Sequence, residues 1–211
     1  MNQTTAKFWI AHGLSVAPSN SITAETKDPN ILTSIIPKLF RCDVRVLHLL
    51  KQVISYHDLP FLTSSAKVVI FDQVVVKHED GSNVDVQKIV EIASDAISIE
   101  ITHPTITSKT MEELLKIPNF PTLDALFLEN VPEIFDIEAF YVHMKKNKTT
   151  NFILLFEESI SDEYMKRLDE ITDEIIGTKD FDYKPALLYF LGIGYERLLQ
   201  LRDIFIPGLE L

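Results

Sequence analysis

The chain has 211 residues, of which 46% are hydrophobic and 24% charged, and its net charge is −11. This composition predicts a globular protein that buries a core without needing a metal or a disulfide. The acidic balance argues against general binding to nucleic acid or to anionic membranes, because carboxylates repel phosphate. The single cysteine, Cys42, excludes an internal disulfide and favours a reducing compartment, the cytoplasm or the nucleus. No apolar run approaches the roughly 20 residues that a membrane-spanning helix requires.

The first 40 residues differ from the rest of the chain. Ser, Thr, Asn and Pro punctuate residues 2–30, which is typical of loops, whereas residues 31–40 (ILTSIIPKLF) have the pattern of a short helix. We therefore expect residues 1–40 to be a loop and capping segment. It would cover the first unit of a domain formed by residues 41–211.

Beyond residue 40, strand patterns and helix patterns alternate at a near-constant spacing. The strand-like runs are rich in β-branched and aliphatic residues and occupy 42–50, 66–76, 96–102, 122–130, 151–158 and 186–193. Helical patterns lie between these runs and after the last of them, at 83–93, 108–117, 136–144, 161–176 and 195–205. This alternation predicts an α/β protein with a mainly parallel sheet.

Several helix ends carry local signals. Asp136 and Ser161 are suited to N-cap positions, and Gly177 to the position that follows a helix. Thr110 and Glu113 have the spacing of a capping box.

Two architectures fit the alternation: a doubly wound sheet covered on both faces, and a leucine-rich-repeat-like solenoid with one open face. The run 96–102 favours the solenoid, because its side chains alternate between apolar and polar. One side receives Ile97, Ile99 and Ile101, and the other receives Ser98, Glu100 and Thr102. The run TLDALFLEN at 122–130 approximates a leucine-rich repeat, although its Asn130 falls one residue early. We predict an irregular leucine-rich-repeat-like solenoid of about six strand-helix units.

Many short phrases of the chain also match one family in the same order. VISYHDLPFL, EDGSNVDV, ITSKTMEELLKIPNF, VPEIFDIEAFYVHMKKNKTTNFILLF and SISDEYMKRLDEITDEIIGTKDFDYKP are similar to segments of a nematode-expanded, largely uncharacterised family. Its members are F-box-associated, leucine-rich-repeat-like proteins, and the resemblance covers roughly residues 45–200. It implies that the repeat region holds a target protein, while an F-box docks on the Skp-type adaptor of a cullin ubiquitin ligase. The first 45 residues contain no clear F-box, so the resemblance leaves the adaptor and cullin link open.

The sequence contains no familiar motif of a catalytic, cofactor-binding or metal-binding site. It lacks the HExxH, GxSxG, P-loop, GxGxxG and paired CxxC patterns, and we expect no catalytic residue, cofactor or metal. Residues 77–85 (KHEDGSNVD) hold potential ligands without EF-hand spacing and predict a turn. His57 adjoins Asp58, which is better placed to cap a helix than to form a catalytic pair. His143 comes late in a helix, where the dipole would favour its charge. Residues 191–194 (LGIG) predict a turn.

If the solenoid prediction holds, each strand adds its outward side chains to one open sheet face. The candidate protein-binding residues are Ser98, Glu100, Thr102, Phe127, Glu129, Ile153 and Leu155. An apolar stripe with an acidic rim is typical of a protein-binding surface. The alternative is that the N-terminal segment or another chain covers this face, which would make it ordinary core.

These patterns favour a non-catalytic protein–protein interaction module whose partner carries basic patches. The family resemblance narrows this to a target-recognition component related to F-box ubiquitin-ligase receptors. The alternative is a small α/β enzyme, which a cluster of histidines or carboxylates at the C-terminal ends of the strands would favour. An RNA-linked role ranks third because of the acidic charge.

Overall fold

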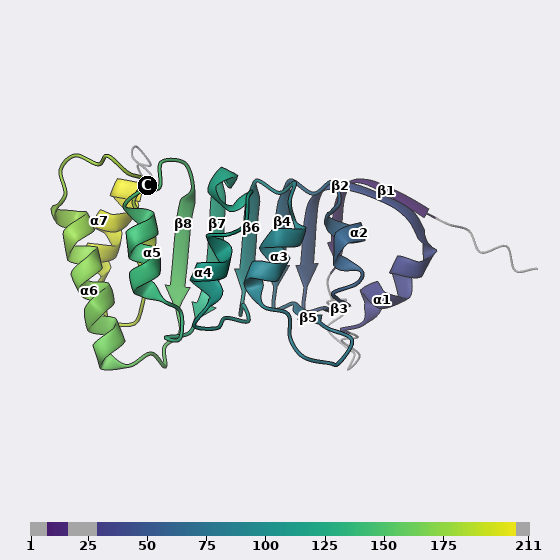
Figure 1. The fold of residues 1–211 in the computed structure, drawn as a ribbon, viewed down its shortest axis with the longest axis horizontal. Coiled ribbons are helices and arrows are strands. Elements are labelled where there is room, and N and C mark those ends of the chain that lie inside the picture. The colour runs from purple at the N-terminus through teal and green to yellow at the C-terminus, as the bar shows by residue number, and fades with distance from the viewer. Residues whose placement is uncertain (1–7, 17–28, 206–211) are drawn as a thin grey trace, which may run out of the picture. The chain divides into compact units, whose positions relative to one another are not determined.

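The computed structural model describes residues 8–16 and 29–205 and divides into two compact units, Met1–Thr105 and Ile106–Leu211. We call them unit 1 and unit 2. In each unit, helices alternate with strands that pair in parallel, so the protein is α/β as predicted (Figure 1). The division falls inside the stretch 41–211, for which the sequence predicted one domain.

Unit 1 contains a parallel sheet in the order β1-β2-β4-β6 and a smaller parallel sheet of β3 and β5. Helices α2 and α3 lie on one face of the larger sheet (Figure 1). The elements are β1 (Phe8–Val16), α1 (Ile31–Ile35), the 3-10 helix η1 (Ile36–Lys38), β2 (Leu39–Leu50), β3 (Val53–Ser55), α2 (Leu59–Thr63), β4 (Val68–Asp72), β5 (Val75–Lys77), α3 (Val86–Ile92) and β6 (Ser98–Thr102).

The prediction that residues 1–40 are a loop and capping segment is wrong for β1. This strand pairs with β2 over its whole length, with Leu14 opposite Leu47. Apolar residues at both ends of FWIAHGLSV give the run enough strand character to join the sheet. A register shift follows His12, which has a φ of 77°, so the strand is bulged there. The short helix predicted at 31–40 exists, as α1 followed by η1.

In unit 1, the backbone makes a similar left-handed corner directly after each of three strands of the larger sheet. Lys51, Gln73 and His103 directly follow β2, β4 and β6, and have φ values of 52°, 53° and 55°. The left-handed conformation is uncommon for residues with a side chain, so its recurrence marks a repeated structural feature. The corner at Gln73 also corrects the prediction of one strand at 66–76, because it separates β4 from β5.

The core of unit 1 lies between the sheet and its helices. Val69, Phe71, Ile99 and Ile101 alternate along β4 and β6 and are at most 2% exposed. Ile97 was expected to share this inward face, but it precedes β6 and is 43% exposed. The backbone leaves the strand alternation there, because the N–H groups of residues 97 and 98 both donate to the Lys67 carbonyl.

Unit 2 contains a parallel sheet in the order β7-β8-β9, with α4 and α5 on one face of its strands (Figure 1). The C-terminal helix α7 packs against α6 and β9. The elements are α4 (Thr110–Leu114), the 3-10 helix η2 (Phe120–Thr122), β7 (Ala125–Val131), α5 (Ile137–Met144), β8 (Asn151–Phe156), α6 (Asp162–Gly177), β9 (Leu187–Tyr189) and α7 (Tyr195–Phe205).

Two of the predicted helix caps are confirmed. The Asp136 carboxylate accepts the Ala139 N–H at 2.9 Å, and the Ser161 hydroxyl accepts the Tyr164 N–H at 3.3 Å. The capping-box prediction is wrong, because Thr110 is already helical and its hydroxyl accepts the N–H of Thr107. Gly177 is the last residue of α6 and is not a left-handed residue beyond it.

The core of unit 2 is aromatic. The rings of Phe120, Phe140 and Phe152 pack together, with 5.4 Å between the centroids of Phe140 and Phe152. Leu126 and Leu128 lie on the same inward side of the sheet and are at most 2% exposed, as expected from their alternation with the outward Phe127 and Glu129. The turn predicted at 191–194 is confirmed, because Gly192 and Gly194 have φ values of 92° and 77°.

Candidate functional site

The outward side chains of unit 2 form rows across its three parallel strands. The strand register aligns Phe127 with Ile153 and Leu187 in one row. The next row contains Glu129, Leu155 and Tyr189. These side chains alternate with the buried residues that face the helices, so they lie on the opposite face of the sheet. We call these six residues the apolar stripe, since all but Glu129 are aliphatic or aromatic.

Every member of the apolar stripe is partly accessible. Phe127, Ile153 and Leu155 are half-buried, and Tyr189 is 43% exposed. By contrast, the inward Phe152 and Leu154 on the same strand are each 1% exposed. Among the residues that the structure describes, no helix or loop covers the stripe completely.

The sequence placed four of these six side chains. Phe127, Glu129, Ile153 and Leu155 share the face that was predicted for them. Leu187 and Tyr189 were missed, because β9 is only three residues long within the apolar run 186–193. A strand inside an all-apolar run has no visible alternation, so only the register identifies its outward side chains.

In unit 1, the corresponding face is less apolar. The register aligns Val46 with Val68 and Ser98 in one row. The next row is His48, Ile70 and Glu100. Ser98 and Glu100 are half-buried and lie on the expected face.

Thr102 differs from the expectation, because it is 7% exposed. Its hydroxyl oxygen accepts the Gln73 N–H at 2.7 Å, and the hydroxyl lies 3.2 Å from a carboxylate oxygen of Asp72. These bonds stabilise the corner after β4, so Thr102 has a structural role and is no longer a candidate protein-binding residue.

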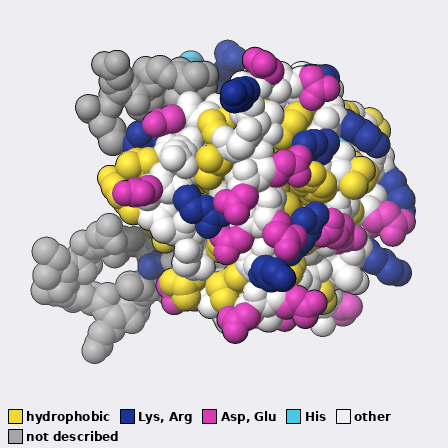
Figure 2. All heavy atoms as spheres, turned by 90° about the vertical axis from the view of Figure 1, so that its left-hand side faces the viewer, with side chains coloured by type: hydrophobic (Ala, Val, Ile, Leu, Met, Phe, Trp, Pro, Cys, Tyr) yellow, Lys and Arg dark blue, Asp and Glu magenta, His cyan; other side chains and the backbone are white. Residues whose placement is uncertain are grey.

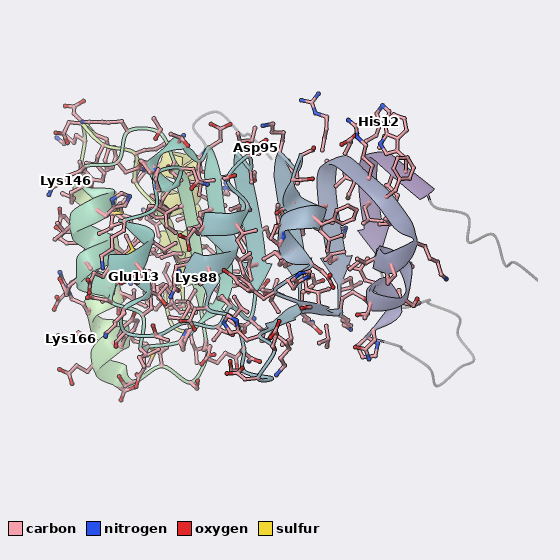
Figure 3. All side chains as sticks on the ribbon, turned by 45° about the vertical axis from the view of Figure 1, so that its right-hand side comes forward. His12, Lys88, Asp95, Glu113, Lys146 and Lys166 are labelled. Carbon is pink, nitrogen blue, oxygen red and sulfur yellow. The ribbon has the colours of Figure 1, made fainter. Side chains whose placement is uncertain are left out.

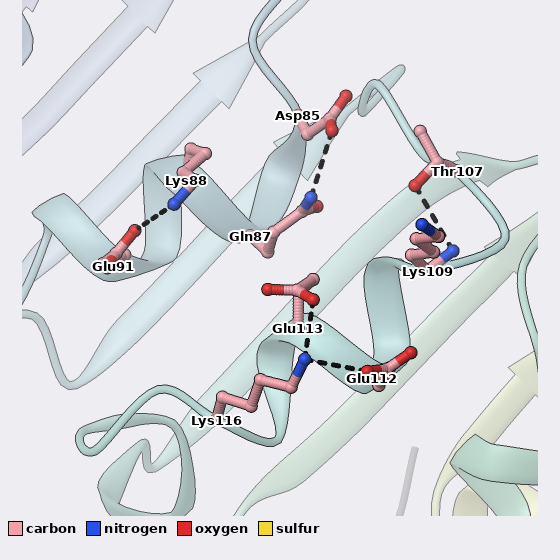
Figure 4. Close-up of polar contacts among 9 residues, drawn as sticks. All are labelled: Asp85, Gln87, Lys88, Glu91, Thr107, Lys109, Glu112, Glu113 and Lys116. Atoms are coloured by element: carbon pink, nitrogen blue, oxygen red, sulfur yellow. Dashed lines mark hydrogen bonds and ion pairs between the residues drawn. The ribbon is translucent and has the colours of Figure 1, made fainter.

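Several charged side chains on the helices of each unit form ion pairs with near neighbours. On α3 the Lys88 ammonium lies 2.8 Å from the Glu91 carboxylate, and the ammonium of Lys116, just after α4, lies 2.8 Å from both Glu112 and Glu113 of that helix (Figure 4). In the view that includes α6, acidic and basic side chains are interspersed, with small hydrophobic areas between them (Figure 2). Such a surface is well solvated and offers few uncompensated groups to a partner.

A basic cluster of Lys145, Lys146 and Lys148 follows α5, and one of its members belongs to this network. Lys145 pairs with Glu174 of α6, and its ammonium lies 4.6 Å from the ring centroid of Tyr183. Lys146 is exposed at the outer side of unit 2 (Figure 3). Lys145 therefore contributes to the packing of α5 against α6, whereas Lys146 and Lys148 are exposed.

The histidine predicted to favour its charged form does the opposite. His143 is half-buried with its ring 5.3 Å from that of Phe120 and 5.6 Å from that of Phe152. Burial, with a smaller contribution from the charge of Lys146, lowers the pKa of His143. Desolvation outweighs the dipole of the eight-residue helix α5.

The remaining sequence candidates have structural roles. Residues 77–85 form a turn, in which Gly81 has a φ of 84° and Asp80 accepts the Ser82 N–H at 2.9 Å. Cys42 is buried and its thiol faces the Leu62 carbonyl, and burial raises the pKa of the thiol. Within residues 8–16 and 29–205, no group of three or more histidine, cysteine or acidic side chains is arranged to hold a metal ion.

No family model, no curated protein and no solved structure matches this chain. In the part of the chain that the structure describes, no helix combines the length and the apolar character needed to cross a membrane.

Proposed function

We propose that this protein is a non-catalytic interaction module that docks a partner protein on the apolar stripe of unit 2. The observation that carries the proposal is the register that places Phe127, Ile153 and Leu187 side by side on the face opposite the helices. Apolar side chains in a contiguous, partly exposed row are costly to leave in water and gain most from being covered by a partner.

We further propose that the strand-helix units stack as an irregular leucine-rich-repeat-like solenoid. Its support is the left-handed corner after successive strands, at Lys51, Gln73 and His103 in unit 1, and the similar conformation of Asn130, with a φ of 61°, near the end of β7 in unit 2. A repeated corner with helices on one face leaves the other face available along the array, which is how solenoids present binding surfaces.

The partner that best suits the stripe has apolar anchor side chains and a basic rim. The chain carries a net charge of −11, and Glu129 lies within the stripe itself. Complementary charge at the rim raises the association rate and selects the partner, while apolar anchors at the centre supply most of the affinity. The resemblance to F-box-associated proteins supports a target-recognition role. It also implies two further partners beside the target protein, a Skp-type adaptor and a cullin.

The second class, a small α/β enzyme, has one observation in its favour. His57, His78, Glu79 and Asp80 lie close to the C-terminal ends of β3 and β5 and line a common pocket. The distance from His57 Nδ1 to the Asp58 carboxylate is 3.7 Å, which is too long for a hydrogen bond. We favour binding over catalysis because this pair lacks the contact that general acid–base chemistry needs.

The test compares partner capture by three forms of the protein in affinity purification with mass spectrometry. They are the wild type, the double variant Phe127→Ala/Leu155→Ala, and a control, Val142→Ala, which removes methyl groups from a side chain that is 52% exposed on α5. We expect the wild type and the control to recover the same specific protein and the double variant to lose it.

The melting temperature of the double variant shows whether Phe127 and Leu155 are surface side chains or core side chains. Phe127 and Leu155 are only partly exposed, so each should contribute about 1 kcal/mol to stability, less than a fully buried side chain, and the double variant should stay folded. A drop of many degrees, or undiminished capture by the double variant, would contradict the proposal. Recovery of a Skp-type adaptor and a cullin would support the ligase role, and their consistent absence would remove that role while leaving the binding module.

A further inference from the structure

Unit 1 contains an open pocket of about 850 Å³ that the proposed function does not use. Its lining includes Tyr56, His57 and Pro60 from the segment after β3. The opposite part consists of His78, Glu79 and Asp80 from the segment after β5. Its volume lies within the range of pockets that bind small molecules, so it has ample room for a long side chain.

The parallel pairing of β3 and β5 brings these segments together. Ser55, the last residue of β3, is opposite Lys77, the last residue of β5, and the Tyr56 N–H donates to the Lys77 carbonyl at 2.8 Å. The C-terminal ends of parallel strands meet at one edge of a sheet, and ligands commonly bind there. The two bonds from Ser82 to the Asp80 carboxylate, at 2.9 and 2.6 Å, fix the second segment.

One part of the pocket lining is aromatic. The rings of Tyr56 and His78 lie 5.0 Å apart with an angle of 59° between their planes. Both side chains are half-buried, so they hold their positions while part of each ring stays accessible. An aromatic ring face attracts a planar or compact cation.

The acidic part of the lining adds negative charge. The two hydrogen bonds from Ser82 lower the pKa of Asp80, so this carboxylate stays ionised. Glu79 is exposed, and no described residue forms a hydrogen bond or ion pair with its carboxylate. Among the described residues, the lining contains two carboxylates, Glu79 and Asp80, and no lysine or arginine. The neighbouring Lys77 directs its ammonium to the Gly81 carbonyl at 3.0 Å.

We propose that this pocket binds an arginine side chain presented by a protein partner. A guanidinium group is planar, so it stacks on Tyr56 while its N–H groups donate to the Glu79 carboxylate. A phosphate would be repelled by the carboxylates, and a purely apolar ligand would bury them without partners. Lysine fits less well, because its ammonium is strongly hydrated and does not stack. The site is independent of the apolar stripe, which lies in unit 2.

The test is a titration of the isotope-labelled full chain, followed by NMR of its backbone amides. The probes are three capped tripeptides, Gly-Arg-Gly, Gly-Lys-Gly and Gly-citrulline-Gly; citrulline has nearly the shape of arginine without its charge. We expect the arginine peptide to shift the amides of residues 55–57 and 78–82 with a dissociation constant on the order of millimolar, as suits one exposed anchor. The lysine peptide should bind more weakly, and the citrulline peptide should leave these amides unchanged.

Two substitutions test whether the arginine side chain contacts Glu79 and Tyr56. Glu79→Gln and Tyr56→Leu should each weaken arginine binding about two- to fivefold, as the loss of one exposed ion pair or cation–π contact implies. Glu91→Gln is the matched control, because it removes the same charge from α3, where Glu91 pairs with Lys88. If Tyr56→Leu fails to fold, Glu79→Gln decides alone, since Glu79 is exposed.

Three results would overturn the proposal: equal binding of the citrulline peptide, equal weakening by Glu91→Gln, or shifts spread over the acidic surface instead of the pocket. The double variant Phe127→Ala/Leu155→Ala should keep full arginine binding, so failure of the stripe and failure of the pocket give different results.

Discussion

Asn147 is the residue whose replacement tests the architecture of unit 2 most directly. It lies just after α5, is 7% exposed, and uses its side-chain amide to shape the turn that leads into β8. The amide nitrogen donates to the carbonyls of Thr150 at 2.7 Å and Lys184 at 3.4 Å. The amide oxygen accepts the N–H groups of Thr149 at 3.2 Å and Thr150 at 3.0 Å. One side chain thus connects the entry to β8 with the segment before β9.

The cost of Asn147→Ala follows from which partners can reach water. Thr150 is 1% exposed, so its N–H and carbonyl would each lose a buried bond worth about 1 to 1.5 kcal/mol. Thr149 is exposed and regains its bond from water, and the 3.4 Å contact to Lys184 is weak. We therefore expect Asn147→Ala to lower the free energy of unfolding by about 2 to 3 kcal/mol.

Chemical denaturation of the purified variants measures this loss. Asn151→Ala is the matched control, because the Asn151 amide donates a single bond, to the Asp124 carbonyl at 3.1 Å, at a half-buried site. Its cost should be near 0.5 to 1 kcal/mol. Asn147→Asp should be at least as damaging as Asn147→Ala, since it places a carboxylate oxygen against the Thr150 carbonyl. If Asn147→Ala costs no more than Asn151→Ala, the turn does not depend on the amide and the reasoning is refuted.

Two further substitutions test the core of unit 2. Phe152→Ala should cost about 3 to 5 kcal/mol, because the ring is 1% exposed and packs edge-on against Phe140, whereas Phe127→Ala on the other face of the sheet should cost about 1 kcal/mol or less. Equal losses in denaturation experiments would mean that the two faces are assigned wrongly. The lowered pKa of His143 means that the unfolded chain, with its ordinary value of 6.5, takes up a proton more readily than the folded protein. This contribution to stability is therefore present above pH 6.5 and is lost as the pH falls below it. His143→Gln should flatten that part of a stability–pH curve relative to wild type, and parallel curves for His143→Gln and wild type would contradict the burial of the imidazole.

The sequence by itself determined the features that depend on neighbouring residues. Asp136 and Ser161 cap α5 and α6 as predicted, because an N-cap bond joins residues only three apart in the chain. The bounds of α7 at Tyr195–Phe205 and the parallel pairing of the strands also follow from periodicity and order. The inward positions of Leu126 and Leu128 follow from strand alternation in the same way.

The tertiary structure decided every feature that depends on which distant segments meet. Residues 8–16 became a strand because β2 was available to pair with them, and Thr102 became buried because the corner at Gln73 needed its hydroxyl. Burial against Phe120 and Phe152 reversed the expected effect on His143. The pocket at Tyr56 and His78 likewise depends on the pairing of β3 with β5. Local propensity is encoded residue by residue, whereas desolvation and register depend on contacts between residues far apart in the chain, and these arise only when the whole unit folds.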